Sequence, residues 1–104
     1  KPIGTGTLLA AEMRGLARAR WVQAAIRHMC ASNRRAAEVL AQHGAGAATD
    51  VTGFGLLGHL VEMTRASEVD ARLVLDRIPV LEGARESIAR GVFSSLQPQN
   101  VRLR

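Results

Sequence analysis

Aromatic residues and cysteines are scarce in this 104-residue chain. Aromatic side chains make up only 3% of it, and they are Trp21, Phe54 and Phe93. We therefore expect a mainly aliphatic hydrophobic core. The single cysteine, Cys30, cannot form a disulfide within the chain, which agrees with a reducing compartment. We expect Cys30 to be a core residue rather than a nucleophile.

Long apolar runs are lacking as well. Charged residues or glycines interrupt each apolar stretch well before the roughly 20 residues that a membrane-spanning helix requires. No leader of charged, apolar and small residues opens the chain. A hydrophobic content of 47% suffices for one small domain with one core. We expect a soluble, cytoplasmic protein that has no membrane partner.

The net charge is positive, but the basic residues are spread along the chain. Lysine and arginine number 14 against 9 acidic residues, so the net charge is +5. Almost all the basic residues are arginines, scattered beside acidic ones, and no basic block is interleaved with aromatics. Nucleic-acid binding usually needs a clustered basic face and rings on which bases stack, so we expect no nucleic-acid partner. The positive balance does favour a polyanionic small ligand such as a nucleoside triphosphate.

The spacing of apolar side chains predicts alternating strands and helices. Apolar residues three and four apart predict four helices, at about residues 20–31, 33–43, 53–66 and 84–90. β-forming or alternating residues predict extended segments at residues 2–11, 47–51 and 69–75. Residues 94–104 lack a period and are expected to form a loop.

Strands separated by helices place the fold in the α/β (α+β) class. The expected architecture is a layered sandwich in which helices cover a small mixed sheet. The sequence contains no internal repeat, and no composition change marks a domain boundary. We therefore expect residues 1–104 to form a single domain.

The most informative segment is residues 47–60, which combines a carboxylate, two hydroxyls and two closely spaced glycines before a predicted helix. Thr52 can cap that helix, whose free N–H groups favour an anion. Asp50 lies two residues earlier, where a carboxylate can bind Mg²⁺ beside phosphate oxygens. Thr49 and Gly53 flank these two residues and can shape a phosphate pocket.

The same residues also allow a purely structural interpretation. Asp and Thr before a helix most often only satisfy backbone donors, and Gly53 and Gly55 can simply permit close packing. Short motifs match by chance frequently, so local chemistry alone does not decide between the two. His59 has no second His or Cys at ligand spacing and is expected to be a satisfied histidine rather than a zinc ligand.

Four stretches together resemble the C-terminal domain of selenophosphate synthetase, a family also called selenide, water dikinase. They are KPIGTG (residues 1–6), MCASN (29–33), TDVTGFGLLGHL (49–60) and IPVL (78–81). The resemblance runs from residue 1 to about residue 100, and its twelve-residue string is far more specific than a lone glycine motif. This family is part of the wider group that resembles aminoimidazole ribonucleotide (AIR) synthetase.

The resemblance implies a phosphotransferase that makes selenophosphate, AMP and phosphate from selenide, ATP and water. ATP would be a substrate and Mg²⁺ the cofactor, and Asp50 matches the family's C-terminal metal-binding aspartate. In phosphoryl transfer the protein mainly positions groups and neutralises charge through metal ions, so Asp50 would be a magnesium ligand and not a nucleophile. Full-length relatives are usually homodimers.

The resemblance also implies that this chain is a truncated C-terminal domain. The family's reactive cysteine or selenocysteine, its partner lysine and its other metal carboxylates belong to an N-terminal domain, and Cys30 does not match that cysteine. We expect no catalytic residue in this chain and no activity when it is isolated. Two other functions stay open: another ATP-dependent enzyme of the superfamily, a ribonucleotide synthetase or thiamine monophosphate kinase, and a non-catalytic nucleotide-sensing module.

Overall fold

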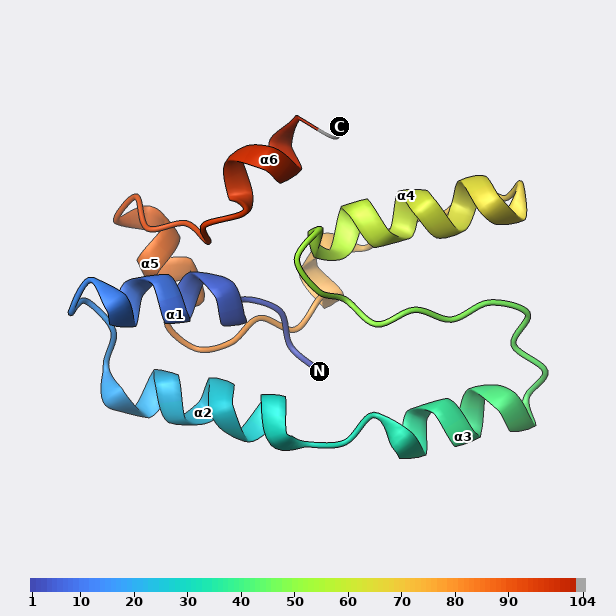
Figure 1. Ribbon diagram of the computed structural model, residues 1–104, viewed down its shortest axis with the longest axis horizontal. Helices are drawn as coiled ribbons and strands as arrows, with labels where there is room; N and C mark the ends of the chain where they lie inside the picture. Colours follow the sequence, from blue (N-terminus) through green and yellow to red (C-terminus); the bar gives the residue numbers. More distant parts are fainter. Residues whose placement is uncertain (103–104) are drawn as a thin grey trace. The chain divides into compact units, whose positions relative to one another are not determined.

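The computed structural model describes residues 1–102, which form helices joined by irregular segments (Figure 1). The helices are α1 (Thr5–Met13), α2 (Ala19–Cys30), α3 (Arg34–Gln42), α4 (Gly55–Ser67), the 3-10 helix η1 (Leu75–Arg77), α5 (Ala84–Ala89) and α6 (Gln97–Val101). The chain divides into two compact units. The first unit holds Lys1–Ala31 and Val74–Pro98, and the second holds Ser32–Leu73 and Gln99–Arg104. The prediction of a single domain stays a prediction.

The predicted α/β sandwich is wrong, because residues 1–102 contain no sheet. Their only β pairing is an isolated parallel bridge between Ile3 and Val80. The Ile3 N–H donates to the Pro79 carbonyl at 2.9 Å, and the Leu81 N–H donates to the Ile3 carbonyl at 2.9 Å. This bridge ties the start of the first unit to the segment before α5. One bridge cannot form a layer on which helices pack.

The segment predicted as the first strand is helical from Thr5 onward. Leu8 and Ala11, three residues apart, are completely buried on one face of α1. This burial of a helical face explains why α1 forms although Thr and Gly at its start are poor helix formers, since tertiary packing readily overrides intrinsic propensity. Gly6 permits close packing there, because a Cβ on it would lie 3.0 Å from the Cβ of Ser94.

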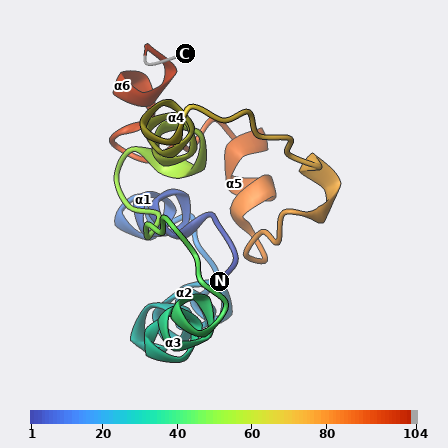
Figure 2. The same cartoon turned by 90° about the vertical axis from the view of Figure 1, so that its right-hand side faces the viewer.

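The core of the first unit forms where α1 contacts α2 and α5 (Figures 1 and 2). Its buried residues are Leu8, Trp21, Ala25, Leu81 and Ala84. The expectation of an aliphatic core is only partly right, because Trp21 is 2% exposed and is the largest fully buried side chain. The predicted helix over residues 20–31 is confirmed as α2, and its buried residues Trp21 and Ala25 are one helical turn apart.

Two glycines allow this core to close around the start of α5. Gly4 has φ +114°, and a Cβ there would lie 2.7 Å from the Cβ of Ala84. Gly83 has φ +82°, and a Cβ there would overlap the indole ring of Trp21. Both positions therefore require a residue that has no side chain and adopts a left-handed backbone without strain.

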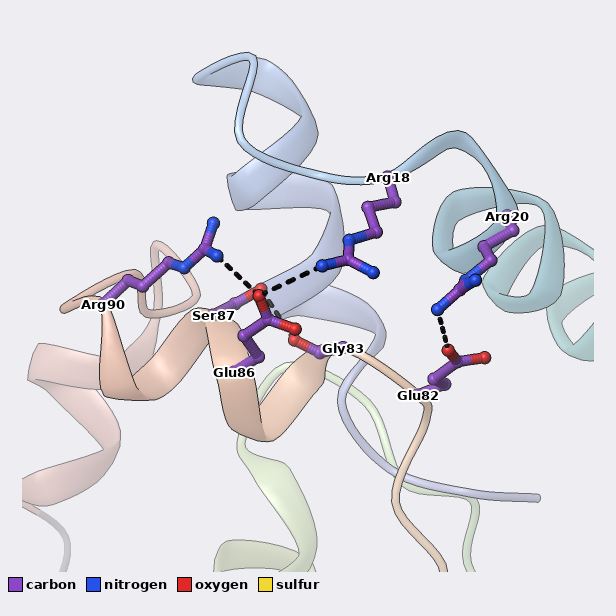
Figure 3. A network of polar contacts seen from close by, with 7 residues as sticks. All are labelled: Arg18, Arg20, Glu82, Gly83, Glu86, Ser87 and Arg90. Carbon is purple, nitrogen blue, oxygen red and sulfur yellow. Dashed lines mark hydrogen bonds and ion pairs between the residues drawn. The ribbon is translucent and has the colours of Figure 1, made fainter.

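Charged side chains form a network on the surface of the first unit (Figure 3). Arg90 pairs with Glu86 at 2.6 Å, and Arg18 lies 3.8 Å from the same carboxylate. Arg20 pairs with Glu82 at 2.7 Å. The pairs of Arg18 and Arg20 link the start of α2 to the start of α5, whereas Arg90 and Glu86 are one turn apart at α5. All these side chains are more than one third exposed. Each pair therefore contributes less than about 1 kcal/mol.

The second unit contains the predicted helices α3 and α4 and lacks an apolar core among its described residues. The end of α3 is as expected, since Gly44 follows it with φ +68°.

The strand predicted at residues 69–75 is wrong. Val69 and Leu75 are 58% and 69% exposed, so the alternating pattern buries no face. A strand also needs a partner, and the described residues supply none.

The last described residues form α6 rather than the predicted loop. Leu103 and Arg104, the end of that predicted loop, lie outside the described residues.

The prediction that Cys30 is a core residue is also wrong, since its side chain is exposed at the end of α2. Among residues 1–102 no helix is both long and apolar enough to cross a membrane.

Candidate functional site

The candidate site is the irregular segment 49–53, which leads into α4 in the second unit (Figure 1). It has no regular secondary structure, so the predicted strand-to-helix junction is a coil-to-helix junction. Thr49, Asp50, Thr52 and Gly53 are all exposed residues. A soluble ligand can therefore reach every residue that the sequence singled out as a site candidate.

Asp50 lies on the exposed part of this segment. Among the described residues its carboxylate forms no ion pair, so its charge is not neutralised by a neighbouring arginine. The hydroxyl of Thr49 donates to the backbone carbonyl of Asp50 at 3.0 Å and leaves the carboxylate oxygens unoccupied. An accessible carboxylate with free oxygens suits a divalent ion.

Thr52 does not cap α4, contrary to the prediction. The residue in the cap position is Phe54, and no side chain there accepts a helix N–H. The Thr52 hydroxyl instead lies 3.2 Å from Nε2 of His59. The backbone makes a tight turn here, because the Gly55 N–H donates to the Thr52 carbonyl at 3.0 Å and Gly55 has φ +70°. The helix therefore starts at Gly55, two positions later than the predicted start at Gly53.

His59 is the residue of α4 that holds this turn. It is 8% exposed, and Nε2 accepts the Thr52 backbone N–H at 3.2 Å. The prediction of a satisfied histidine is confirmed. Because Nε2 is already engaged, this nitrogen is unavailable as a metal ligand in this conformation.

Asn100 of α6 holds Gly53, the residue after Thr52. Sequence reasoning did not identify Asn100 as a site residue. Its Nδ2 donates to the Gly53 carbonyl at 2.9 Å, across 47 positions of sequence. The same Nδ2 would lie 3.7 Å from a Cβ placed on Gly55. No local pattern could have indicated this contact, because residues 94–104 have no period and the partner is a backbone atom.

Phe54 covers the start of α4. Its ring centroid lies 5.6 Å from that of His59, with the two planes tilted by 56°. A Cβ on Gly58 would lie only 2.9 Å from the Cβ of Phe54. Gly58 therefore permits Phe54 to pack closely against the first turn of α4.

The described residues supply only part of a metal site. Among residues 1–102 no three His, Cys, Asp or Glu side chains lie together as a metal-binding cluster. Mg²⁺ commonly takes one or two carboxylates and completes its shell with phosphate oxygens and water. Asp50 fits that role as one ligand, and the remaining ligands would have to come from a nucleotide, water or other protein residues.

The sequence matches the family described as AIR synthase related protein, C-terminal domain, over residues 3–96. Among the curated relatives is a selenide, water dikinase from Porphyromonas gingivalis, which is 38% identical over 102 residues, 98% of this chain and 29% of the relative. Enzymes of the same name from Carboxydothermus hydrogenoformans and Enterobacter sp. strain 638 are each 43% identical. These matches cover 89% and 88% of this chain, and 27% and 26% of those relatives.

The chain thus spans between a quarter and a third of the length of these curated relatives. The matches bear out the resemblance to the selenophosphate synthetase C-terminal domain that the sequence motifs indicated. The site segment 49–53 lies inside the matched residues 3–96.

Proposed function

Because the chain belongs to the AIR synthase related protein C-terminal domain family, we propose that it works as part of a selenophosphate synthetase. The reaction would convert selenide, ATP and water to selenophosphate, AMP and phosphate. The observation that carries this proposal is the string TDVTGFGLLGHL at residues 49–60, together with relatives named selenide, water dikinase that match 88% or more of the chain. In the whole protein, the remaining length would supply the reactive residue, and the assembly would be a cytoplasmic homodimer.

The role proposed for this chain is to bind Mg²⁺ against the phosphates of ATP through Asp50. Two observations support the proposal: Asp50 is exposed, and its carboxylate forms no ion pair with any of residues 1–102. Such an ion, when bound, would neutralise charge on the phosphate oxygens. Asp50 would hold it by a carboxylate oxygen and would not react itself.

Thr49, Thr52 and Gly53 are proposed to shape the phosphate pocket beside Asp50. The proton of the Thr49 hydroxyl is already donated to the Asp50 carbonyl, so this hydroxyl is not free to donate to phosphate in the present conformation. The Thr52 N–H is likewise donated to His59. We therefore infer that these residues set the shape of the segment rather than supply the donors to an anion.

One carboxylate is too little for catalysis, so we expect the isolated 104-residue chain not to hydrolyse ATP. The described residues contain a single candidate ligand at the site and no cluster of three. In-line phosphoryl transfer relies on metal ions and donors placed around the phosphate. Magnesium-dependent release of phosphate by the purified chain, lost in Asp50→Ala, would show that its catalytic groups have been misassigned.

A chimera tests the proposed reaction directly. The 102-residue stretch that matches in the Porphyromonas gingivalis enzyme is replaced by the corresponding residues of this chain. We expect AMP formation from ATP that requires selenide. A chimera that folds and binds ATP but forms no AMP with selenide would contradict the proposal. AMP or ADP formation with a ribonucleotide or thiamine monophosphate in place of selenide would favour the other enzymes of the superfamily, and nucleotide binding without turnover would favour a sensing module.

A further inference from the structure

We propose that His59 is a positioning residue, which holds the segment carrying Asp50 in its metal-binding conformation by accepting the backbone N–H of Thr52. This inference rests on the proposed role of Asp50. It assigns a function to the second-last residue of the string at residues 49–60, a histidine that the reaction itself does not use.

The contact with the Thr52 backbone gives Nε2 the role of acceptor. A backbone N–H can only donate, and Thr52 N lies 3.2 Å from Nε2 of His59, so Nε2 is the acceptor. The Thr52 hydroxyl lies 3.2 Å from the same nitrogen. A neutral imidazole with an accepting Nε2 carries its proton on Nδ1. His59 therefore presents a lone pair to the segment and cannot be replaced there by a donor.

The placement of His59 makes it a rigid support. It is 8% exposed and lies in the second turn of α4, below the Phe54 ring at a centroid distance of 5.6 Å. It is the only described residue of the second unit that is buried. A side chain that is locked by a helix and by packing can hold a loop more precisely than another loop can.

The segment has few other restraints. Thr49, Asp50 and Val51 are exposed, and among residues 1–102 the only hydrogen bond of Asp50 joins its own carbonyl to the Thr49 hydroxyl. Beyond His59, the side chain that holds the segment is Asn100, through the Gly53 carbonyl at 2.9 Å. Thr52 is two residues from Asp50, so releasing Thr52 lets the backbone of Asp50 move. Ordering that backbone again would then oppose ion binding.

The wild-type protein gives the first test. In the isotope-labelled 104-residue chain, the ¹⁵N shifts of the His59 ring report the tautomer, and a scalar coupling through the hydrogen bond would join the Thr52 amide nitrogen to Nε2. We expect the Nδ1–H tautomer and this coupling. A proton on Nε2 at neutral pH would overturn the inference without any variant having to fold.

The second test compares two substitutions of His59 whose amide side chains differ in length. His59→Gln places its amide oxygen about where Nε2 lies, whereas His59→Asn is one carbon shorter and cannot reach Thr52. Mn²⁺ serves as the probe, and its affinity is read from the broadening of the amide signals of residues 49–53. We expect His59→Asn to weaken Mn²⁺ binding about tenfold and to speed Thr52 amide exchange, and His59→Gln to restore both to within about threefold of wild type. Equal Mn²⁺ affinity in His59→Asn and wild type would overturn the inference.

Asp50→Asn separates this inference from the proposed function. If Mn²⁺ broadens the segment equally in Asp50→Asn and wild type, the metal role of Asp50 fails, whatever the tautomer of His59. If Asp50→Asn abolishes the broadening while His59→Asn leaves it unchanged, Asp50 keeps its role and only the positioning role of His59 fails.

Discussion

Replacing Gly83 by alanine tests how the core of the first unit is built. Gly83 precedes α5 with φ +82°, and a Cβ at this position would overlap the indole ring of Trp21. The substitution thus imposes two costs at once: a left-handed backbone for a residue with a side chain, and an intrusion into the largest buried side chain of the unit.

Gly91 provides a matched control for the first of these costs. It follows α5 with φ +75°, and a Cβ there would meet nothing within 4 Å. Gly91→Ala therefore carries only the backbone cost of about 1–2 kcal/mol. Gly83→Ala adds overpacking, which typically costs about 1–3 kcal/mol, for a total loss of about 2–5 kcal/mol.

The assay is urea unfolding followed by the fluorescence of Trp21, the only tryptophan of the chain. The reporter lies in the first unit, so it follows the unit that the two substitutions affect. We expect the free energy of unfolding to fall further for Gly83→Ala than for Gly91→Ala, by about 1–3 kcal/mol. Equal losses in the two variants would refute the close packing of Trp21 against Gly83.

Two further predictions concern the surface network and the start of α4. Glu86→Gln removes the carboxylate shared by Arg18 and Arg90, and because these groups are exposed we expect a loss of only about 0.5 kcal/mol that disappears in about 1 M salt, measured by the same unfolding assay. Gly58→Ala should lower stability by about 1 kcal/mol although alanine favours helices, because its Cβ would lie 2.9 Å from that of Phe54. A more stable Gly58→Ala protein, with the ring-current shifts of His59 unchanged, would contradict that packing.

The helices could be predicted from the sequence because their signals are local. The stripe that predicted residues 20–31 appears as α2, Ala19–Cys30, and Gly91 follows α5 in the left-handed conformation that was expected. The strands could not be predicted reliably, because a strand depends on a partner elsewhere in the chain. At Thr5 the local preference of Thr and Gly was overridden by the burial of Leu8 and Ala11.

Only part of the candidate site could be predicted from the sequence. The segment around Asp50 was visible in the sequence as a carboxylate, two hydroxyls and glycines before a predicted helix. The contacts that hold it were not visible. His59 reaches back seven residues to Thr52, and Asn100 reaches Gly53 from 47 residues away. Both contacts end on backbone atoms, and backbone atoms leave no signature in a sequence of residue types.

The proposed function depends most on the carboxylate of Asp50. Its direct test is selenide-dependent AMP formation by the chimera with the Porphyromonas gingivalis enzyme, comparing Asp50→Asn with Asp70→Asn, a change at another exposed carboxylate of the second unit. Asparagine keeps the size of the side chain and removes the charge that a divalent ion requires. We predict a loss of at least about a hundredfold for Asp50→Asn and near-normal turnover for Asp70→Asn. Near-normal turnover of a folded Asp50→Asn chimera would contradict the proposed role of Asp50 as a metal ligand.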